Sequence, residues 1–460
     1  MTDKKTVDKQ IFRILFPMIL ENLLTISASL VTTAMVGRLL TTDISAQGVA
    51  NRITNTYFSL FKGLAMGVTV IAAIYFGRQR ADKARRTVEQ AFSTAIPLAV
   101  IISALIALFP SPWVKLLTSE PEMLVIAGNY LRLMALGLPF VAISCFVTAA
   151  FQAQGNTKVP MYIAGIMNII NILLGWALIF GNFGAPAMGL TGAGIALVSS
   201  QIAGALIGVY LLYQRNFGLF SSTPSSGRFW AMDLSLMKEI YTVGVPAAGE
   251  NLFWQFATIV ISRIILSYGS AHYAAYQLGL QAEGVTEMLS VGFITAATTL
   301  AANAIGAQDD ELYQAYYHRL SRICLGVSLL CTAILLFANT FLMSLLTDKP
   351  DLIAIGAKYM FVMGFTQIPI NMSKILNGFI RAAGHKYTPM VISFVGIWMV
   401  RVLFSFIFSN MMHLPIDGIW WAIAMDLFVR YFMSLWVMKR HKVMEHVRSE
   451  KQAAADAVAV

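Results

Sequence analysis

The residues in this sequence best suited to chemistry are two glutamates that stand inside long apolar runs. Glu21 lies in segment 17–23 (Pro-Met-Ile-Leu-Glu-Asn-Leu), and Glu250 lies in segment 246–252 (Pro-Ala-Ala-Gly-Glu-Asn-Leu), 229 residues later. Burial disfavours the charged form of a carboxyl, so such a group is suited to take up a proton on one side of a membrane and release it on the other. We therefore predict Glu250 as the principal ion-coupling residue and Glu21 as a secondary one.

A second pair of carboxylates stands one helical turn apart. Glu283 and Glu287 have the spacing that places two side chains on one helix face. Their role has two readings: a structural partnership with Lys374 or Arg401, or a direct part in transport. We include both glutamates in the predicted ion-coupling set.

Other polar side chains occur at similar depth in the apolar runs. Asp426 and Arg430 also stand one turn apart, and we expect them to be structural charges that reach water near a helix end. Amides at this depth orient ligands or join helices by hydrogen bonds. The amides predicted to bind substrate are Asn22, Asn168, Asn171, Asn251, Gln255, Gln277 and Gln281.

The elements that position these groups must be membrane helices. Hydrophobic residues make up 57% of the 460 residues and charged residues 12%, far from the balance of soluble domains. About a dozen spans of roughly 20 residues fit this length. Apolar runs predict helices near 12–38, 46–76, 90–110, 122–152, 160–181, 190–213, 238–268, 275–305, 319–346, 353–381, 388–410 and 417–438. The longer runs are expected to tilt, or to bend at Pro17, Pro139, Pro246 and Pro369.

The chain reads as one unit duplicated. At the offset of 229, Gly77 meets Gly306, Gln79 meets Gln308, Tyr130 meets Tyr359, Gly155 meets Gly384 and Pro160 meets Pro389. Six helices per repeat is an even number, so the two halves share their orientation in the membrane. We predict an all-α integral membrane protein of twelve transmembrane helices, in two six-helix bundles related by pseudo-two-fold symmetry. The predicted parts are a first lobe (1–214), a linker (215–237), a second lobe (238–440) and a tail (441–460).

The distribution of lysine and arginine sets the predicted orientation. Basic residues concentrate at both ends of the chain, after the second helix and around the linker. Positive residues mark cytoplasmic segments, so both termini are predicted to be cytoplasmic in the inner (plasma) membrane. The net charge of +10 is explained by this topology, and we expect no nucleic-acid partner.

The sequence lacks the patterns of an enzyme or a metalloprotein. The histidines fall in predicted loops and tails, and no phosphate-binding loop or metal motif is present. The cysteines Cys145, Cys324 and Cys331 lie in apolar runs without metal-ligand spacing. We predict no catalytic activity, no cofactor and no bound metal, so the energy source is expected to be an ion gradient.

Several motifs together resemble one family over nearly the whole chain. They are segments 31–38 (Val-Thr-Thr-Ala-Met-Val-Gly-Arg), 151–157 (Phe-Gln-Ala-Gln-Gly-Asn-Thr), 171–181 (Asn171 to Phe180-Gly181) and 296–307 (Ala-Ala-Thr-Thr-Leu through Gly306-Ala307). With the duplicated plan, they resemble the multidrug and toxic compound extrusion (MATE) family of the multidrug/oligosaccharidyl-lipid/polysaccharide flippase superfamily. The resemblance implies two lobes forming a V and antiport of protons or sodium ions against organic cations.

The sequence departs from part of the family pattern. Many members have Asp where this chain has Thr32, and archaeal-type members build a cation site in the first lobe from that residue together with three others. Here Asn171 is kept, but the other two positions read as Gly175 and Leu197. The resemblance therefore implies that the first lobe lacks a strong sodium site. The Glu-Asn-Leu pattern at Glu21 and Glu250 instead resembles a bacterial branch of the family, which implies that a helix-7 carboxylate, here Glu250, couples transport.

The sequence thus predicts a secondary active multidrug efflux antiporter. It would exchange protons or sodium ions for organic, mostly cationic amphiphilic compounds, with membrane lipid around it and one chain as the working unit. The alternative is a flippase for a lipid-linked saccharide or other amphiphile. A flippase of that kind would need a strongly cationic cleft, whereas the repeated glutamates favour cationic cargo.

Overall fold

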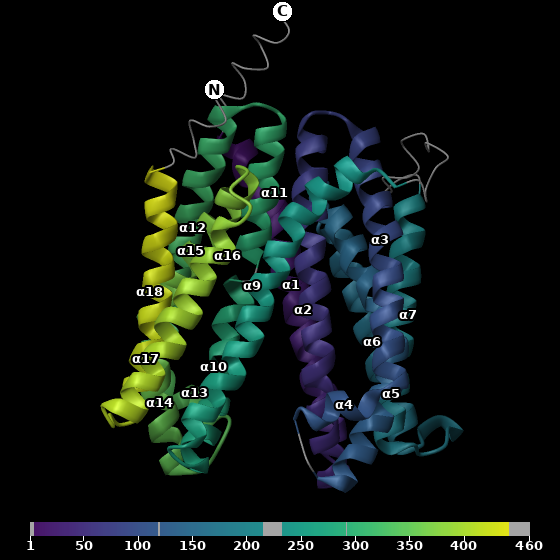
Figure 1. Ribbon diagram of the computed structural model, residues 1–460, viewed down its shortest axis with the longest axis vertical. Helices are drawn as coiled ribbons and strands as arrows, with labels where there is room; N and C mark the ends of the chain where they lie inside the picture. Colours follow the sequence, from purple (N-terminus) through teal and green to yellow (C-terminus); the bar gives the residue numbers. More distant parts are fainter. Residues whose placement is uncertain (1–3, 118–119, 215–231, 291, 441–460) are drawn as a thin grey trace, which may run out of the picture. The chain divides into compact units, whose positions relative to one another are not determined.

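The computed structural model describes residues 4–117, 120–214, 232–290 and 292–440. The described residues form helices and no strand (Figure 1). From the start of the chain to the middle the helices are α1 (Lys4–Val36), α2 (Thr41–Gly77), α3 (Ala81–Leu108), α4 (Pro110–Lys115), α5 (Pro121–Ala153), α6 (Lys158–Phe180), η1 (Asn182–Gly184) and α7 (Gly189–Tyr213). Most of the predicted linker, residues 215–231, and the predicted tail lie outside the described residues.

The second half repeats the plan with more breaks. Its helices are α9 (Leu234–Leu266), α10 (Ser270–Ser290), α11 (Gly292–Gly306), α12 (Asp310–Phe337), α13 (Asn339–Ser344), α14 (Pro350–Gly364), α15 (Gln367–Ala382), α16 (Thr388–Phe394), η2 (Val395–Val402), α17 (Leu403–Phe406), η3 (Ile407–Met411) and α18 (Asp417–Arg440). The segments η2 and η3 are π-helical turns within a single long helix.

These helices fit a membrane protein. Ten candidate spans among the described residues are long and apolar enough to cross a membrane, and the bent pair α14 and α15 makes an eleventh. The helix α9 corresponds to the remaining predicted span, since its 33 residues extend roughly 50 Å at 1.5 Å per residue. The predicted helices are thus confirmed, with ends shifted by a few residues in most cases.

The predicted bend near Pro369 is present, as a break between α14 and α15. The axes of α14 and α15 differ by 49°, and the break at residues 365–366 lies just before Pro369. Pro17, Pro139 and Pro246 instead lie inside α1, α5 and α9, which continue as helices across them. The prediction that the longer helices tilt, or bend at these three prolines, stays a prediction, because a helix can bend at a proline without ending there.

The internal repeat extends to the backbone of the turns. Gln79 and Gln308, which are 229 residues apart, both have left-handed backbones with φ of 58° and 54°. Gly155 and Gly384, at the same offset, have φ of 71° and 93°. A left-handed backbone is uncommon outside glycine, so its presence at both Gln79 and Gln308 is informative. Together with the glycine pair, it indicates that the two halves fold in the same way.

The contacts divide the chain into two compact units. One comprises Leu20–Ala248, and the other comprises Met1–Ile19 together with Gly249–Val460. We call them the 20–248 unit and the 249–460 unit. The predicted lobes put all of α1 in the first half and all of α9 in the second, whereas by contacts the first part of each helix packs with the opposite repeat. The lobe boundaries stay a prediction, drawn from the sequence repeat.

The first part of α9 packs very closely on α2 inside the 20–248 unit. A Cβ on Gly63 would lie 2.3 Å from the Ala248 Cα, and one on Gly67 would lie 2.3 Å from the Ile240 carbonyl oxygen. Only glycine allows this approach, which is the usual way that membrane helices gain packing contacts. Buried Phe61, with neighbours from α5, continues the same core.

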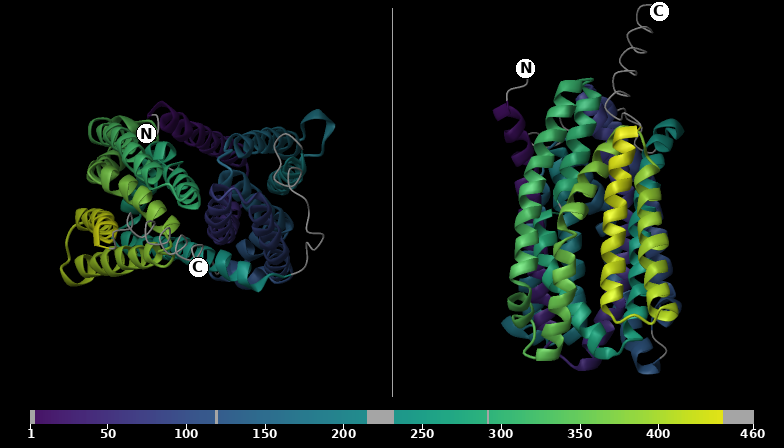
Figure 2. Two further views of the ribbon diagram at one scale, coloured as in Figure 1. Left: turned by 90° about the horizontal axis from the view of Figure 1, so that it is seen from above. Right: turned by 90° about the vertical axis from the view of Figure 1, so that its left-hand side faces the viewer.

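The 249–460 unit is built around α15. This helix contacts α11, α12 and α18. Figure 2 shows α18, in yellow, running beside the yellow-green helix formed by α16, η2, α17 and η3. An aromatic cluster fixes α10, α14 and α18 together, since Tyr276 stacks on Trp420 with ring centroids 5.5 Å apart and Tyr359 meets Trp420 edge-on at 5.1 Å. The result is a rigid frame around the polar groups of this unit.

Candidate functional site

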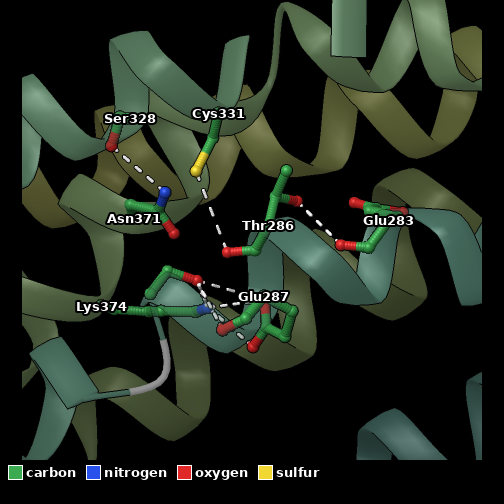
Figure 3. Close-up of polar contacts among 8 residues, drawn as sticks. Glu283, Thr286, Glu287, Ser328, Cys331, Asn371 and Lys374 are labelled. Atoms are coloured by element: carbon green, nitrogen blue, oxygen red, sulfur yellow. Dashed lines mark hydrogen bonds and ion pairs between the residues drawn. The ribbon is translucent and has the colours of Figure 1, made fainter. Parts of the chain in front are cut away.

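The predicted carboxylate pair on α10 lies against α15. Lys374 of α15 places its Nζ 2.8 Å from each carboxylate oxygen of Glu287 and 3.1 Å from the Ser290 hydroxyl (Figure 3). One turn earlier, Glu283 has a different partner, because the Tyr359 hydroxyl of α14 donates to its Oε2 at 2.7 Å. The structural partnership with Lys374 is therefore present for Glu287, while Glu283 is held by a neutral donor.

Glu250, the predicted principal coupling residue, is also in an ion pair. The Arg381 Nη2 lies 2.6 Å from Glu250 Oε2, and the Ser393 hydroxyl donates to Oε1 at 3.0 Å. The Arg381 side chain is 3% exposed and that of Glu250 is 21% exposed. The pair joins α9 to α15, and charge-assisted bonds of this length are among the stronger ones. The sequence indicated no basic residue within one turn of Glu250, and the partner comes from a distant helix instead.

A third set of charges joins α18 to the π-helical segment η2. Asp426 is fully buried and accepts from two arginines: Arg401 Nη2 at 2.8 Å, and Arg430 through its Nε at 2.8 Å and its Nη2 at 3.0 Å. Arg401 also stacks on Trp254 of α9, with its Cζ 4.7 Å from the ring centroid. The expectation that Asp426 reaches water is wrong, because its turn of α18 packs against Gly396, where a Cβ would lie 2.3 Å from Asp426 Oδ1.

The 20–248 unit holds fewer charges at depth. Glu21 of α1 has one buried carboxylate oxygen, Oε2, without a hydrogen-bond partner among the described residues, and Lys62 of α2 is the basic residue that acts on it electrostatically. Farther along α1, the Asn171 amide of α6 donates to the Thr32 hydroxyl at 3.2 Å. Leu197 packs on the apolar core of this unit. The positions Thr32 and Asn171 thus meet as the resemblance implies, and the two groups that bond there are neutral.

The remaining predicted amides are spread over several helices. Asn22 on α1, and Asn251 and Gln255 on α9, are half-buried and have interactions of their own. Gln277 on α10 is half-buried, whereas Gln281, one turn later, is exposed. The Nδ2 of Asn168 on α6 is buried without a hydrogen-bond partner in the part of the chain that the structure describes.

Sequence reasoning missed three partners of the acidic groups. Arg381 was set aside as a charge at a predicted helix end, although it is almost fully buried. Ser393 gave no signal, because a single serine in an apolar run is common. Tyr359 did give a signal in the sequence, because it matches Tyr130 at the offset of 229 and therefore occupies a repeated position.

Within the described residues, no group of three or more His, Cys, Asp or Glu is placed to hold a metal ion. Cys324 and Cys331 are buried thiols on α12, and Cys145 on α5 is half-buried.

Comparison with known proteins gives the family. The model of the MatE family matches residues 17–177 and 246–407, two stretches that begin 246 − 17 = 229 residues apart. The chain belongs to the MatE family. The two matched stretches also confirm the repeat, because each covers the first five predicted helices of one half.

Relatives and solved structures of the MatE family match this chain almost from end to end. A probable multidrug resistance protein NorM of Thermotoga maritima is 28% identical over 444 residues, covering 93% of this chain and 91% of the relative. A probable multidrug resistance protein YoeA of Bacillus subtilis is 26% identical, covering 95% and 96%. Among solved structures, MATE in complex with MaL6 has a TM-score of 0.87 at 17% identity, covering 95% of this chain and 97% of that one. A MOP superfamily transporter from Pyrococcus furiosus has a TM-score of 0.85 at 17% identity, with 96% of each chain covered.

The fold is therefore that of the MATE transporters: an all-α membrane protein of twelve helices in two bundles. Prediction of the fold class and of the family from sequence is confirmed. The MatE family consists of transporters, and the chain is accordingly a membrane transporter and not an enzyme.

Proposed function

We propose that this protein is a secondary active antiporter that exports organic, mostly cationic amphiphilic compounds in exchange for protons or sodium ions. Its relatives NorM and YoeA carry the description of multidrug resistance proteins, which supports export of varied small molecules. We infer the coupling ion and the residues that carry it from the geometry of the site. In this reading the protein lies in the inner membrane as a monomer, with both termini cytoplasmic.

One observation carries the proposal: the 249–460 unit contains a set of ionisable side chains at membrane depth. Its carboxylates are Glu250, Glu283, Glu287 and Asp426, on α9, α10 and α18. Charges in this environment are costly and are usually retained for function. An acid that gains or loses a proton changes the charge that a cationic compound meets, so the two ligands exclude each other.

The polar amides suit a binding surface that accepts varied cargo. Half-buried Asn251 and Gln255 follow Glu250 on α9, and Gln277 lies on α10 with Glu283. Amides donate and accept hydrogen bonds without a fixed charge, which favours tolerance of different compounds. We propose that they contact the cargo, together with Asn22, Asn168 and Asn171 in the 20–248 unit.

Transport by the purified protein in liposomes tests the proposal. Vesicles are loaded with ethidium, a fluorescent organic cation, and a pH gradient or a sodium gradient is imposed separately. We expect one gradient to drive ethidium across the membrane against its concentration, and protein-free vesicles to show only leak. Absence of uphill movement under either gradient, with movement of a labelled lipid-linked saccharide instead, would support the flippase alternative and refute antiport.

A further inference from the structure

The four carboxylates at membrane depth in the 249–460 unit, Glu250, Glu283, Glu287 and Asp426, are not equivalent. Glu287 is held by Lys374, Glu250 by Arg381, and Asp426 by Arg401 and Arg430. Glu283 makes no ion pair with any described residue, and its carboxylate accepts from the Tyr359 hydroxyl at 2.7 Å. One acid of the four therefore lacks a fixed counter-charge in direct contact.

The charges around Glu283 come from several elements. Glu287 lies one turn away on α10, Lys374 is on α15 and Arg401 is on η2, and each acts on Glu283 electrostatically. On α14 its neighbour is Tyr359. On α12 the Cys331 thiol donates to the carbonyl oxygen of Thr286, which lies three residues after Glu283 on α10. Glu283 thus lies in a field that contains both signs of charge, and among the described residues its carboxylate accepts a hydrogen bond only from a neutral hydroxyl.

The sum of these charges gives Glu283 a specific effect. The four carboxylates, when ionised, balance four bases: Lys374, Arg381, Arg401 and Arg430. If Glu283 is protonated, the group has three negative and four positive charges, a net charge of +1. At low dielectric that excess repels a cationic compound, and loss of the proton removes the repulsion.

The same contacts disfavour sodium. A hard cation needs several oxygen ligands, and carboxylates supply the best ones. At Glu287, however, the Lys374 Nζ already contacts three oxygens, at 2.8, 2.8 and 3.1 Å. In the same way, arginine guanidinium groups already bond the carboxylate oxygens of Glu250 and Asp426, so these oxygens are not free to bind sodium. Glu283 alone offers one carboxylate and a hydroxyl that donates to it, which accommodates a proton but makes a poor sodium site.

We propose that Glu283, bonded by Tyr359, is the residue that takes up and releases the coupling proton, and that sodium does not replace it. This inference rests on the proposed antiport and specifies its ion. Inward movement carries a proton on the Glu283 carboxyl, and outward movement carries the organic cation with Glu283 ionised. Tyr359 keeps its own proton throughout and positions the carboxylate.

Proton release on binding tests the inference separately from transport. Ethidium is added to purified protein in a weakly buffered solution with a pH indicator, below the pH at which release is half complete. We expect the wild type to release protons as the cation binds. Glu283→Gln, which fixes the neutral state, should bind the cation more weakly and should release no protons even at ethidium concentrations that saturate it. Glu283→Asp, which keeps the acid, should retain release. Glu311→Gln, a substitution at the exposed start of α12, serves as the matched control and should behave as the wild type.

Tyr359→Phe keeps the proposal testable if Glu283→Gln does not fold. It removes the hydroxyl that stabilises the carboxylate, so the midpoint of the pH profile for transport should move to higher pH while transport itself remains. Proton release by Glu283→Gln at the wild-type level, an unchanged pH profile in Tyr359→Phe, or uphill ethidium export driven by sodium alone would each overturn the inference. A wild type with no gradient-driven transport at all would instead refute the proposed function.

Discussion

The ion pair between Glu250 and Arg381 makes Glu250→Gln a test of stability as well as of transport. Glutamine keeps the shape of the side chain and an oxygen that accepts from Ser393, but it removes the negative charge that Arg381 contacts at 2.6 Å. Since the Arg381 side chain is 3% exposed, its guanidinium stays buried without a counter-charge. We therefore expect this substitution to destabilise the folded protein.

The expected size follows from the burial of the two partners. Removing one partner of a buried pair costs about 3–5 kcal/mol. The retained bond to Ser393 and the 21% exposure of Glu250 put this case near the lower end, about 3 kcal/mol. In Glu283→Gln the Tyr359 hydroxyl still donates to the amide oxygen, so that variant should lose less than about 1 kcal/mol.

Thermal unfolding in mild detergent, followed by size-exclusion fluorescence, measures the difference. Glu250→Gln should unfold at a clearly lower temperature than Glu283→Gln. Replacing Arg381 by Met in the Glu250→Gln background removes the unpaired charge at similar volume, so the double variant should recover most of the lost stability. Equal midpoints for Glu250→Gln and Glu283→Gln, or no recovery in the double variant, would refute this reasoning.

The double variant also separates two roles of Glu250. If the pair only positions α9 against α15, the stable double variant should retain proton-driven ethidium transport. If Glu250 carries the coupling proton, as the sequence predicts, transport should be lost although the protein is stable. Transport in liposomes distinguishes the two outcomes.

Three further predictions concern topology, sodium and packing. Reporters fused to the C-terminus and inserted at Ser225 should be accessible only from the cytoplasm in intact cells, and an externally exposed reporter would contradict the topology. Asn171→Ala should leave sodium affinity in calorimetric titrations unchanged, because the 20–248 unit offers only neutral groups there; loss of a tight sodium site would show otherwise. Gly67→Ala should lower the unfolding midpoint, at a cost of about 1–3 kcal/mol, because its Cβ meets the Ile240 carbonyl oxygen at 2.3 Å. Gly48→Ala, with nothing within 4 Å of the new Cβ, is the matched control, and equal midpoints would contradict close packing at Gly67.

The helices and the repeat could be predicted from sequence because both depend on local or regularly spaced signals. Apolar runs of sufficient length gave the spans, and the offset of 229 paired Gln79 with Gln308 and Gly155 with Gly384, which share unusual backbone angles. These features need no knowledge of which helices are neighbours.

The partners of the acids could not be predicted in the same way. Arg381 is 131 residues from Glu250, and Tyr359 is 76 residues from Glu283. Such pairings depend on how helices pack, which one sequence does not reveal. Asp426 shows the opposite error. We predicted that it reaches water near a helix end, but Gly396 has no side chain, so the helix that contains it packs closely enough to bury Asp426 completely.

The grouping of residues 1–19 with the second half of the chain has a consequence for synthesis. Leu15 lies against Gly292 of α11, the Gln10 side chain accepts from the Tyr316 hydroxyl at 2.5 Å, and Asp8 pairs with Arg319. The first helix is made first, but about 300 residues must follow before these partners exist. At about 5–20 residues per second, the beginning of α1 lacks its partners for on the order of tens of seconds, until α11 and α12 have been synthesised. The segment that is translated first is thus among the last to complete its contacts. A factor that shields apolar helices during membrane insertion would therefore act longest on the beginning of α1.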